Sequence, residues 1–299
     1  MAMSFSPDRV LGRTGFRVTR LGIGDLADRA IPFQTLVDTL RRALDAGLNL
    51  VDTAPSYEEG YSEQIVGAAV EGRREKVFVI DKIDHVDQPV GPQVEASLAR
   101  LHMRAADAFV FHGVSDPEVW SALVTPGGRM DELEEQVRLG RASFRGVSSH
   151  HPDVVRAAIL SGRCDIVMFA IGPWVDGRYE ELVALARARG VGTVCFKTFG
   201  AGMLLADTAG YQKPLPGQAP AAELPRELPR LSVRDCVHYA LSRNPDVALL
   251  GLSSPREQDE AFDAALDFRM PLAEGDLAAI RARAARAIAG KGKCWWNPA

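Results

Sequence analysis

The feature that most constrains the fold of this chain is a repeated alternation of short apolar runs with longer amphipathic runs. The short runs, rich in Val, Ile, Leu and Phe, predict strands, and the longer runs, with apolar residues three or four apart, predict helices. The predicted strands are residues 20–24, 48–53, 76–83, 107–113, 143–149, 165–171, 192–198 and 246–252. The predicted helices are residues 32–47, 62–72, 92–103, 130–140, 152–162, 179–190, 231–245 and 255–266.

Eight strand-then-helix units over about 250 residues predict an α/β fold, a (β/α)8 TIM barrel. An N-terminal β-hairpin is predicted before it, with Gly15 in its turn. An open doubly wound sheet is the alternative, but its phosphate loop GxGxxG is missing, because Ala27 follows Gly22 and Gly24. We therefore expect residues 1–299 to form one domain that ends in a C-terminal tail over residues 270–299.

The composition argues against several classes of protein, such as nucleic-acid binders, membrane proteins and disulfide-rich or zinc-finger proteins. The formal net charge is -4 and no basic block is longer than Arg73–Arg74, so we expect no nucleic-acid binding. No run approaches the roughly 18 apolar residues of a membrane span, so we expect a cytoplasmic protein, a monomer or small homo-oligomer. The cysteines are far apart and form no CxxC pair, which argues against a zinc finger or a disulfide framework. They are Cys164, Cys195, Cys236 and Cys294.

One segment interrupts the alternation. Residues 206–230 follow the seventh predicted strand, and 213–230 contain five prolines in eighteen residues. Loops of this length in compact domains usually have a purpose. The segment is either a lid over the site or a surface excursion stiffened by proline.

Polar side chains stand at the carboxyl ends of three neighbouring predicted strands. Asp52 closes the second strand, Tyr57 lies in the following loop, Lys82 closes the third and His112 closes the fourth. Each alone has an ordinary structural explanation, such as a turn cap, a rim aromatic, a solvated lysine or a core histidine. A barrel brings the ends of adjacent strands into one small volume, so the four together predict an active site.

The chemistry of these four side chains suits a carbonyl group. A tyrosine with a pKa of about 10 is a poor acid at neutral pH, but the nearby Lys82 ammonium stabilises the Tyr57 phenolate and lowers its pKa. Asp52 would keep Lys82 charged in a partly buried site. His112 could hold and polarise the carbonyl oxygen. This is a general-acid site without a hydride source of its own.

The chain resembles the aldo-keto reductase superfamily from the hairpin to about residue 268. The stretches that carry the resemblance are "LGRTGFRVTRLGIG", "GLNLVDTAPSYEEGYSEQIVGAAV", "VFVIDKI", "DAFVFHG" and "FRGVSSHHPDVVRAAI". The resemblance implies that Asp52, Tyr57, Lys82 and His112 form the family's catalytic tetrad. It also implies a nicotinamide dinucleotide as hydride source, and a small-molecule carbonyl or alcohol as substrate.

The resemblance further implies a set of cofactor-binding positions. They are Gly24, Ser148, Ser149, Met168, Phe196, Lys197, Thr198, Gly200, Gly202, Ser253, Arg256 and Glu257. Phe196 matches the aromatic residue that stacks on the nicotinamide. Ser149 stands where the family usually has asparagine, and Met168 where it usually has glutamine. Glu257 stands where many members have an arginine for the 2'-phosphate, so the family implies NADPH while Glu257 leaves NADH open.

Three further residues are expected at the substrate pocket. Asp25 stands where many relatives have threonine, and His85 and Trp174 follow strand ends.

Two other functions remain open on the sequence. One is a redox-sensing or regulatory subunit of the same fold, as the potassium-channel β subunits resemble. The other is a hydrolytic barrel in which His85, His112, His150 and His151 bind a metal, although a lysine beside a metal needs a special reason. We expect no metal.

Overall fold

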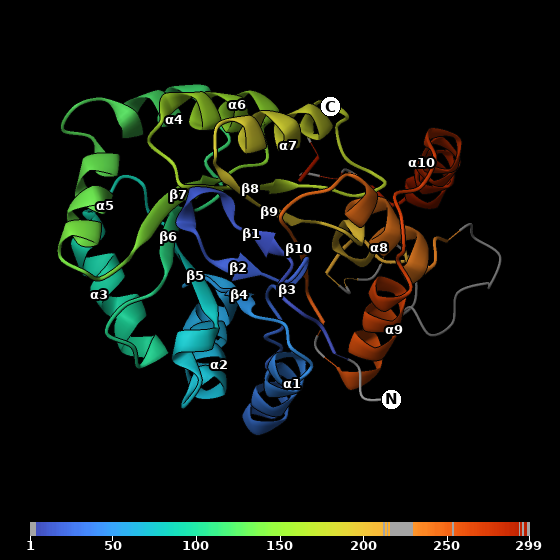
Figure 1. Ribbon diagram of the computed structural model, residues 1–299, viewed down its shortest axis with the longest axis horizontal. Helices are drawn as coiled ribbons and strands as arrows, with labels where there is room; N and C mark the ends of the chain where they lie inside the picture. Colours follow the sequence, from blue (N-terminus) through green and yellow to red (C-terminus); the bar gives the residue numbers. More distant parts are fainter. Residues whose placement is uncertain are drawn as a thin grey trace.

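The computed structural model describes residues 4–211, 213, 215, 230–252, 254–292, 294 and 296–297. Eight parallel strands form a closed barrel in the order β10-β3-β4-β5-β6-β7-β8-β9 (Figure 1). Their bounds are β3 (Leu21–Ile23), β4 (Leu50–Asp52), β5 (Phe78–Ile83), β6 (Ala108–Phe111), β7 (Phe144–Ser148), β8 (Ile166–Ala170), β9 (Gly192–Phe196) and β10 (Val247–Leu250). All eight predicted strands, and the barrel, are confirmed.

Helices surround the barrel (Figure 1). They are α1 (Phe33–Asp45), α2 (Tyr61–Val70), α3 (Val90–Leu101), α4 (Pro117–Val124), α5 (Arg129–Arg138), α6 (Pro152–Ser161), α7 (Arg178–Ala188), α8 (Val233–Ser242), α9 (Pro255–Leu266) and α10 (Glu274–Ile288). Short 3-10 turns are η1 (Gly12–Thr14), η2 (Tyr57–Gly60), η3 (Arg74–Lys76) and η4 (Gly200–Gly202). The eight predicted helices are confirmed. Helices α4 and α10 were not predicted, and α10 occupies much of the expected tail.

The apolar core has two parts. The larger part fills the space between the strands and the surrounding helices. The smaller part fills the interior of the barrel and consists of Leu11, Val18, Leu50, Phe78, Ile80, Ala108, Val110, Ile166, Met168, Val194, Val247 and Leu249. Because both faces of the strands are covered, their near-continuous apolar sequences are explained.

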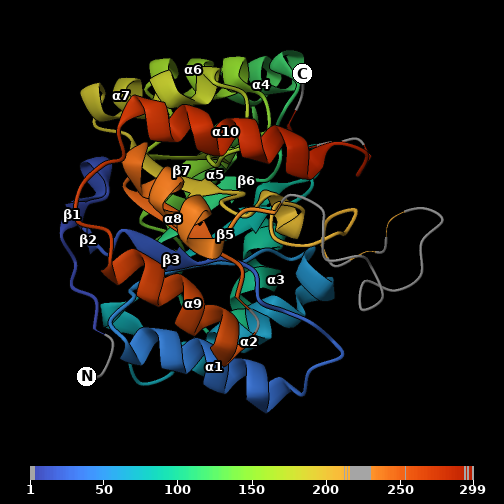
Figure 2. The same cartoon turned by 90° about the vertical axis from the view of Figure 1, so that its right-hand side faces the viewer.

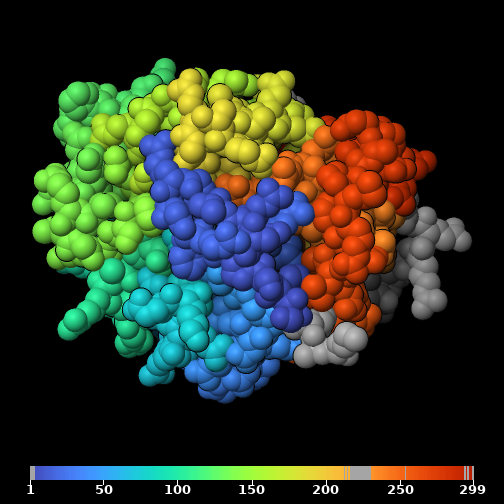
Figure 3. All heavy atoms as spheres, in the orientation of Figure 1, coloured from blue at the N-terminus to red at the C-terminus, as the bar shows by residue number. Residues whose placement is uncertain are grey.

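The N-terminal hairpin closes one end of the barrel, and Figure 3 shows it over the centre of that face. Strands β1 (Arg9–Val10) and β2 (Arg17–Val18) pair antiparallel, as predicted. Gly12 has a φ of 48°, and a Cβ there would lie 2.2 Å from the backbone nitrogen of Gly192, at the start of β9. The hairpin therefore covers the amino ends of the strands, which leaves the carboxyl ends for a site.

The end of the chain packs onto the segment that follows β9, while α10 runs along the outside of the barrel near α8 (Figure 2). Trp296 is 1% exposed and lies against Gly200. The Lys291 ammonium donates to the carbonyl oxygens of Met203 and Ala206, both at 2.7 Å. The described part of the tail is thus docked rather than solvated.

No helix among the described residues is long and apolar enough to cross a membrane. The four cysteines are free thiols, and Cys164, Cys195 and Cys236 are buried. Of the segment 206–230, residues 212, 214 and 216–229 lie outside the described residues, and with them most of the expected lid.

Candidate active site

An ion pair joins the ends of β4 and β5 inside the mouth of the barrel. The Nζ atom of Lys82 lies 2.7 Å from Oδ1 of Asp52 and donates to the carbonyl oxygen of Thr53, also at 2.7 Å. Both side chains are buried. Burial by itself would lower the pKa of Lys82, but attraction to Asp52 and the hydrogen bond outweigh it and raise that pKa. The direction of this pKa agrees with the expectation that Asp52 keeps Lys82 charged.

Tyr57 begins the short turn η2, directly above this ion pair. The Lys82 ammonium lies 4.5 Å from the centre of the Tyr57 ring. Burial raises the pKa of the Tyr57 hydroxyl above its usual value, while attraction and hydrogen bonding from Lys82 lower it. Lys82 acts to lower the pKa of Tyr57, as expected. The expectation that this pKa is lowered overall was wrong, because burial of the hydroxyl is the larger cause. The phenol keeps its proton at neutral pH.

His112 directly follows β6, and its ring packs edge-on against the Tyr57 ring, with the centroids 5.6 Å apart. Its Nδ1 atom makes a close hydrogen bond with Oδ1 of Asp84. Asp84 also accepts a 2.7 Å hydrogen bond from the backbone nitrogen of Ser56. Burial acts to raise the pKa of Asp84, but the bonds from His112 and Ser56 lower it overall. An ionised Asp84 therefore makes Nδ1 of His112 the donor, which leaves Nε2 for a ligand.

Asp84 was missed by the sequence reasoning, although it directly follows β5. It stands immediately after the last residue of the strand that contains Lys82. An acid just beyond the end of a barrel strand could have been singled out for the same reason as Asp52.

Asp25 lies after β3 at the same mouth. Its Oδ1 atom accepts a 2.9 Å hydrogen bond from the backbone nitrogen of Ala27. Burial raises the pKa of Asp25 to about 6, and the Asp52 charge adds to this, while Lys82 opposes it. Attraction to Asp25 opposes the lowering of the Lys197 pKa by burial and by Lys82. Asp25 is therefore grouped with the charged side chains of the mouth, and its place at a substrate pocket stays a prediction.

Phe196, the last residue of β9, is half-buried and packs against the His150 ring, with the centroids 5.0 Å apart. Nδ1 of His150 lies 3.2 Å from the Trp296 carbonyl oxygen. Burial, with the nearby Lys197 charge, lowers the pKa of His150 to about 4, so the ring is neutral at neutral pH. The tail thus supports the residue expected to stack on the nicotinamide.

Lys197 follows Phe196 with a φ of 69°, in the left-handed region. Its ammonium contacts the hydroxyl of Tyr211 and lies 4.6 Å from the centre of that ring. Burial, with the charge of Lys82, lowers the pKa of Lys197 to about 8. The contact with Tyr211 was not predicted, because the two residues are fourteen positions apart in the loop.

Most of the other predicted positions at the strand ends form hydrogen bonds with nearby backbone groups. Ser148 accepts a 2.9 Å hydrogen bond from the backbone nitrogen of Gly113, and the Ser149 hydroxyl bonds to the backbone of His151. Met168 is fully buried in the barrel interior. The backbone nitrogen of Gly24 donates to the carbonyl oxygen of Leu250 at 2.9 Å, and the buried Thr198 donates to that of Leu249 at 3.4 Å.

The amino end of α9 has an acidic cap. Glu257 and Ser254 form a capping box, in which each side chain accepts from the other's backbone nitrogen. The neighbouring Arg256 is exposed and donates to Glu260 at 3.2 Å. Ser253 lies outside the described residues.

The remaining predicted positions lie at the edge of the site. His85 is exposed, and its backbone is paired with the Gln93 side chain. Trp174 is half-buried and packs against the outer core. Over the part of the chain that is described, no three His, Cys, Asp or Glu side chains are grouped as a metal site requires.

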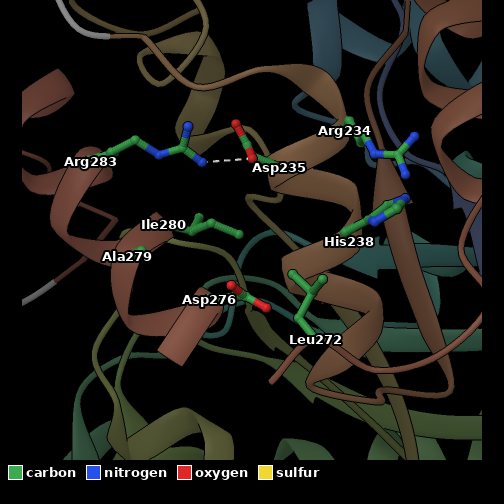
Figure 4. A pocket seen from close by; sticks show the side chains of 8 residues that line it. All are labelled: Arg234, Asp235, His238, Leu272, Asp276, Ala279, Ile280 and Arg283. Carbon is green, nitrogen blue, oxygen red and sulfur yellow. Dashed lines mark hydrogen bonds and ion pairs between the residues drawn. The ribbon is translucent and has the colours of Figure 1, made fainter. Parts of the chain in front are cut away.

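A separate cavity of about 290 Å³ lies between α8 and α10, on the outside of the barrel (Figure 4). Arg283 points toward Asp235 and donates to it at 2.7 Å, so the two charges that meet there neutralise each other. None of the residues that line this cavity belongs to the mouth of the barrel.

A closed parallel barrel with a buried Lys–Asp pair and a tyrosine at its carboxyl end defines a (β/α)8-barrel protein with a candidate acid–base site. The family model described as "Aldo/keto reductase family" matches residues 20–283. The chain therefore belongs to the aldo-keto reductase family, as its resemblance implied.

Individual relatives are distant. The NADH-specific methylglyoxal reductase of Escherichia coli is 26% identical over 223 residues, which are 65% of this chain and 68% of that protein. Methylglyoxal reductase YeaE of the same organism is 33% identical over 119 residues, 39% of each chain. Aldo-keto reductase YhdN of Bacillus subtilis is 33% identical over 162 residues, 48% of each. The chain thus spans about two thirds of the first relative and about half or less of the other two.

Solved structures share the fold at low identity. An aldo-keto reductase from Bacillus halodurans in its holo form is 23% identical, with a TM-score of 0.68 over 94% of this chain and 96% of that one. An aldo-keto reductase from Klebsiella pneumoniae in complex with NADPH is 20% identical, with a TM-score of 0.67 over 92% and 94%.

Proposed function

We propose that this protein is a nicotinamide-dependent oxidoreductase that reduces an aldehyde or ketone to an alcohol, or catalyses the reverse. Tyr57 is the general acid in reduction and the general base in oxidation. The observation that carries this proposal is the buried pair of Lys82 and Asp52, 2.7 Å apart, with the Tyr57 ring 4.5 Å from the ammonium. A cation held beside a phenol stabilises the phenolate that proton transfer leaves behind.

The proton follows a short path. In reduction, the Tyr57 hydroxyl gives its proton to the carbonyl oxygen while the carbonyl carbon accepts a hydride, so one alcohol forms. The raised pKa of Tyr57 keeps that proton in place before the reaction, and Lys82 limits the cost of losing it. Because Nδ1 of His112 is bonded to Asp84, Nε2 is the ring atom that orients the carbonyl oxygen.

A nicotinamide dinucleotide supplies the hydride when it is bound. The residues at the mouth fit such a group. Phe196 offers a half-buried ring for the nicotinamide, and the hydroxyls of Ser148 and Ser149, at the carboxyl end of β7, could bond its carboxamide. At Gly202, which has a φ of 87°, no described atom beyond its chain neighbours lies within 4 Å of an added Cβ, so the backbone could approach a phosphate there, and Lys197 of the same segment could add positive charge.

The acidic cap of α9 favours NADH over NADPH. A Glu257 carboxylate held at the helix terminus by Ser254 would repel a 2'-phosphate and could accept from a ribose hydroxyl. Arg256, by contrast, is directed to Glu260. The Escherichia coli relative named as NADH-specific is consistent with this proposal.

The test is cofactor titration followed by a carbonyl panel. Binding is measured by fluorescence with NADH and with NADPH, and turnover is measured with aldehydes and ketones, including methylglyoxal, the substrate named for two relatives. Tyr57→Phe should bind cofactor normally but lose roughly 10²–10⁴-fold in kcat, the usual size of a general-acid contribution. Tyr61→Phe, four residues on, should retain wild-type turnover. Equal turnover of Tyr57→Phe and wild type would refute the proposed acid.

A further inference from the structure

Two buried carboxyl groups lie on the outer side of the strand that contains Lys82. Successive side chains of a strand point to opposite faces, so Asp81, the neighbour of Lys82 on β5, points away from the mouth. It meets Glu63 of α2, and both carboxyl groups are 0% exposed. Neither residue has a part in the proton path described above.

The hydrogen bonds of this pair leave one oxygen without a donor. Both carboxylate oxygens of Glu63 are bonded by the Arg100 guanidinium, from α3. Oδ1 of Asp81 accepts a 2.8 Å hydrogen bond from the Lys82 backbone nitrogen. Oδ2 of Asp81 is buried and has no donor among the described residues. An ionised carboxylate with such an oxygen is costly, whereas a neutral acid can donate to Glu63.

The charges around the pair also favour protonation of one of the two carboxyl groups. The charged groups that face Asp81 are Glu63 from α2, Arg100 from α3 and Lys82 from its own strand. Arg100 is paired with Glu63, and Lys82 with Asp52, so neither cation forms its ion pair with Asp81. Attraction to Lys82 still lowers the pKa of Asp81, but burial and Glu63 outweigh it. Burial first, and then repulsion from Glu63, raise the pKa of Asp81 well above its usual range.

We propose that Asp81 and Glu63 share one proton, and that this pair positions the Tyr57 turn against the strand that contains Lys82. Glu63 lies in the first turn of α2, which follows the Tyr57 turn directly. Gly60 ends that turn with a φ of 81°, and a Cβ there would lie 2.7 Å from Cδ of Arg100. Asp81 is bonded to the Lys82 backbone. Asp81 and Glu63 are thus positioning residues, and this role rests on the proposed function.

The shared proton is tested without any turnover. At pH 8 the infrared spectrum of the wild type should contain a carboxylic-acid carbonyl band that Asp81→Asn lacks, because the variant has an amide in place of the acid. The amide can still donate to Glu63, so the pairing of the two side chains is kept. The Asp28→Asn variant, which alters an exposed hydrogen bond to the Ala30 backbone, should keep the band. Because the pKa of Asp81 is raised by folding, wild-type stability should fall relative to Asp81→Asn as the pH rises above about 4. A wild type without the band at pH 8 overturns the sharing of a proton.

The positioning role is tested by turnover. Asp81→Ala should lower kcat roughly 10- to 100-fold, as small displacements of reacting groups do, with the cofactor Kd within about twofold, and Asp81→Asn should restore most of the loss. Wild-type kcat should also fall at alkaline pH as the shared proton is lost, and kcat of Asp81→Asn should not. This comparison tests the positioning role even if Asp81→Ala does not fold. An unchanged kcat in Asp81→Ala, or identical pH profiles, overturns the role. If the wild type reduces no carbonyl, the proposed function fails while the infrared result stands.

Discussion

At the scale of single residues, the site depends on how burial and charge compete at each ionisable group. Attraction to Asp52 outweighs burial at Lys82, so the ammonium is stabilised. At Tyr57 burial outweighs the same ammonium. At Asp25 burial outweighs both Lys82 and the Ala27 hydrogen bond. The pKa of each of these three groups is therefore set by its own balance of burial against nearby charges and hydrogen bonds. The residue types alone do not determine that balance.

Asp25 gives a prediction on stability against pH. Its pKa is about 6 in the folded protein and near 3.9 when unfolded, so stability present below pH 4 is lost as the pH rises through 6. Asp25→Asn keeps the acceptor for the Ala27 backbone without the charge. We expect it to match the wild type at pH 4 and to exceed it by on the order of 1 kcal/mol at pH 8, allowing for solvent screening.

The measurement is thermal unfolding of both proteins from pH 4 to pH 8. Asp28→Asn is the matched control, because Asp28 accepts a 2.8 Å hydrogen bond from the Ala30 backbone in the same way, but that bond is exposed. Parallel curves for Asp25→Asn and wild type would contradict the raised pKa.

At the scale of helices and strands, the pattern of apolar residues was sufficient to predict the barrel. The apolar runs of the strands and the 3.6-residue period of the helices are local features, and they predict all eight strand-then-helix units. Helix α4 was missed although Asp116 caps it and Pro117 begins it, which are ordinary start signals. Helix α10 was missed because the region was treated as a tail, although Leu277, Ile280, Ala284 and Ile288 lie on one buried face.

The packing of α2 on α3 gives a prediction on stability. A Cβ on Gly67 would lie 2.3 Å from the carbonyl oxygen of Leu101, so the two helices can approach only with glycine there. Gly67→Ala should destabilise the protein by about 1–3 kcal/mol. Gly91→Ala is the control, because its added methyl would meet only Gln136, at 3.5 Å. Denaturant titration in which both variants match the wild type would show that α2 can shift without cost.

At the scale of the whole molecule, the two ends of the chain close the barrel from opposite sides. The hairpin covers the amino ends of the strands, and Trp296 packs beside Gly200 and His150 near the carboxyl ends. The tail therefore links the stability of the chain to the place where the dinucleotide is proposed to bind.

Trp296 gives the corresponding prediction. Trp296→Ala should cost about 3–5 kcal/mol of unfolding free energy, as removal of a buried aromatic does, and should weaken dinucleotide binding because His150 and Gly200 lose their support. Denaturant unfolding and fluorescence titration measure the two effects. Met270→Ala, at a side chain that is 72% exposed, should change neither. A stable Trp296→Ala that binds dinucleotide as tightly as the wild type would mean that the tail is not part of the site.

The sequence by itself determined the fold class, the order of its strands and helices, and the meeting of Asp52, Tyr57, Lys82 and His112, because periodicity is local and a barrel brings strand ends together. Only the tertiary structure decided the support around them. The hydrogen bond that His112 donates to Asp84, the pairing of Asp81 with Glu63, and the raised pKa of Tyr57 depend on how deeply each group is buried and on charges from distant elements. Burial and distant charge are properties of packing, and no local pattern of residues encodes them.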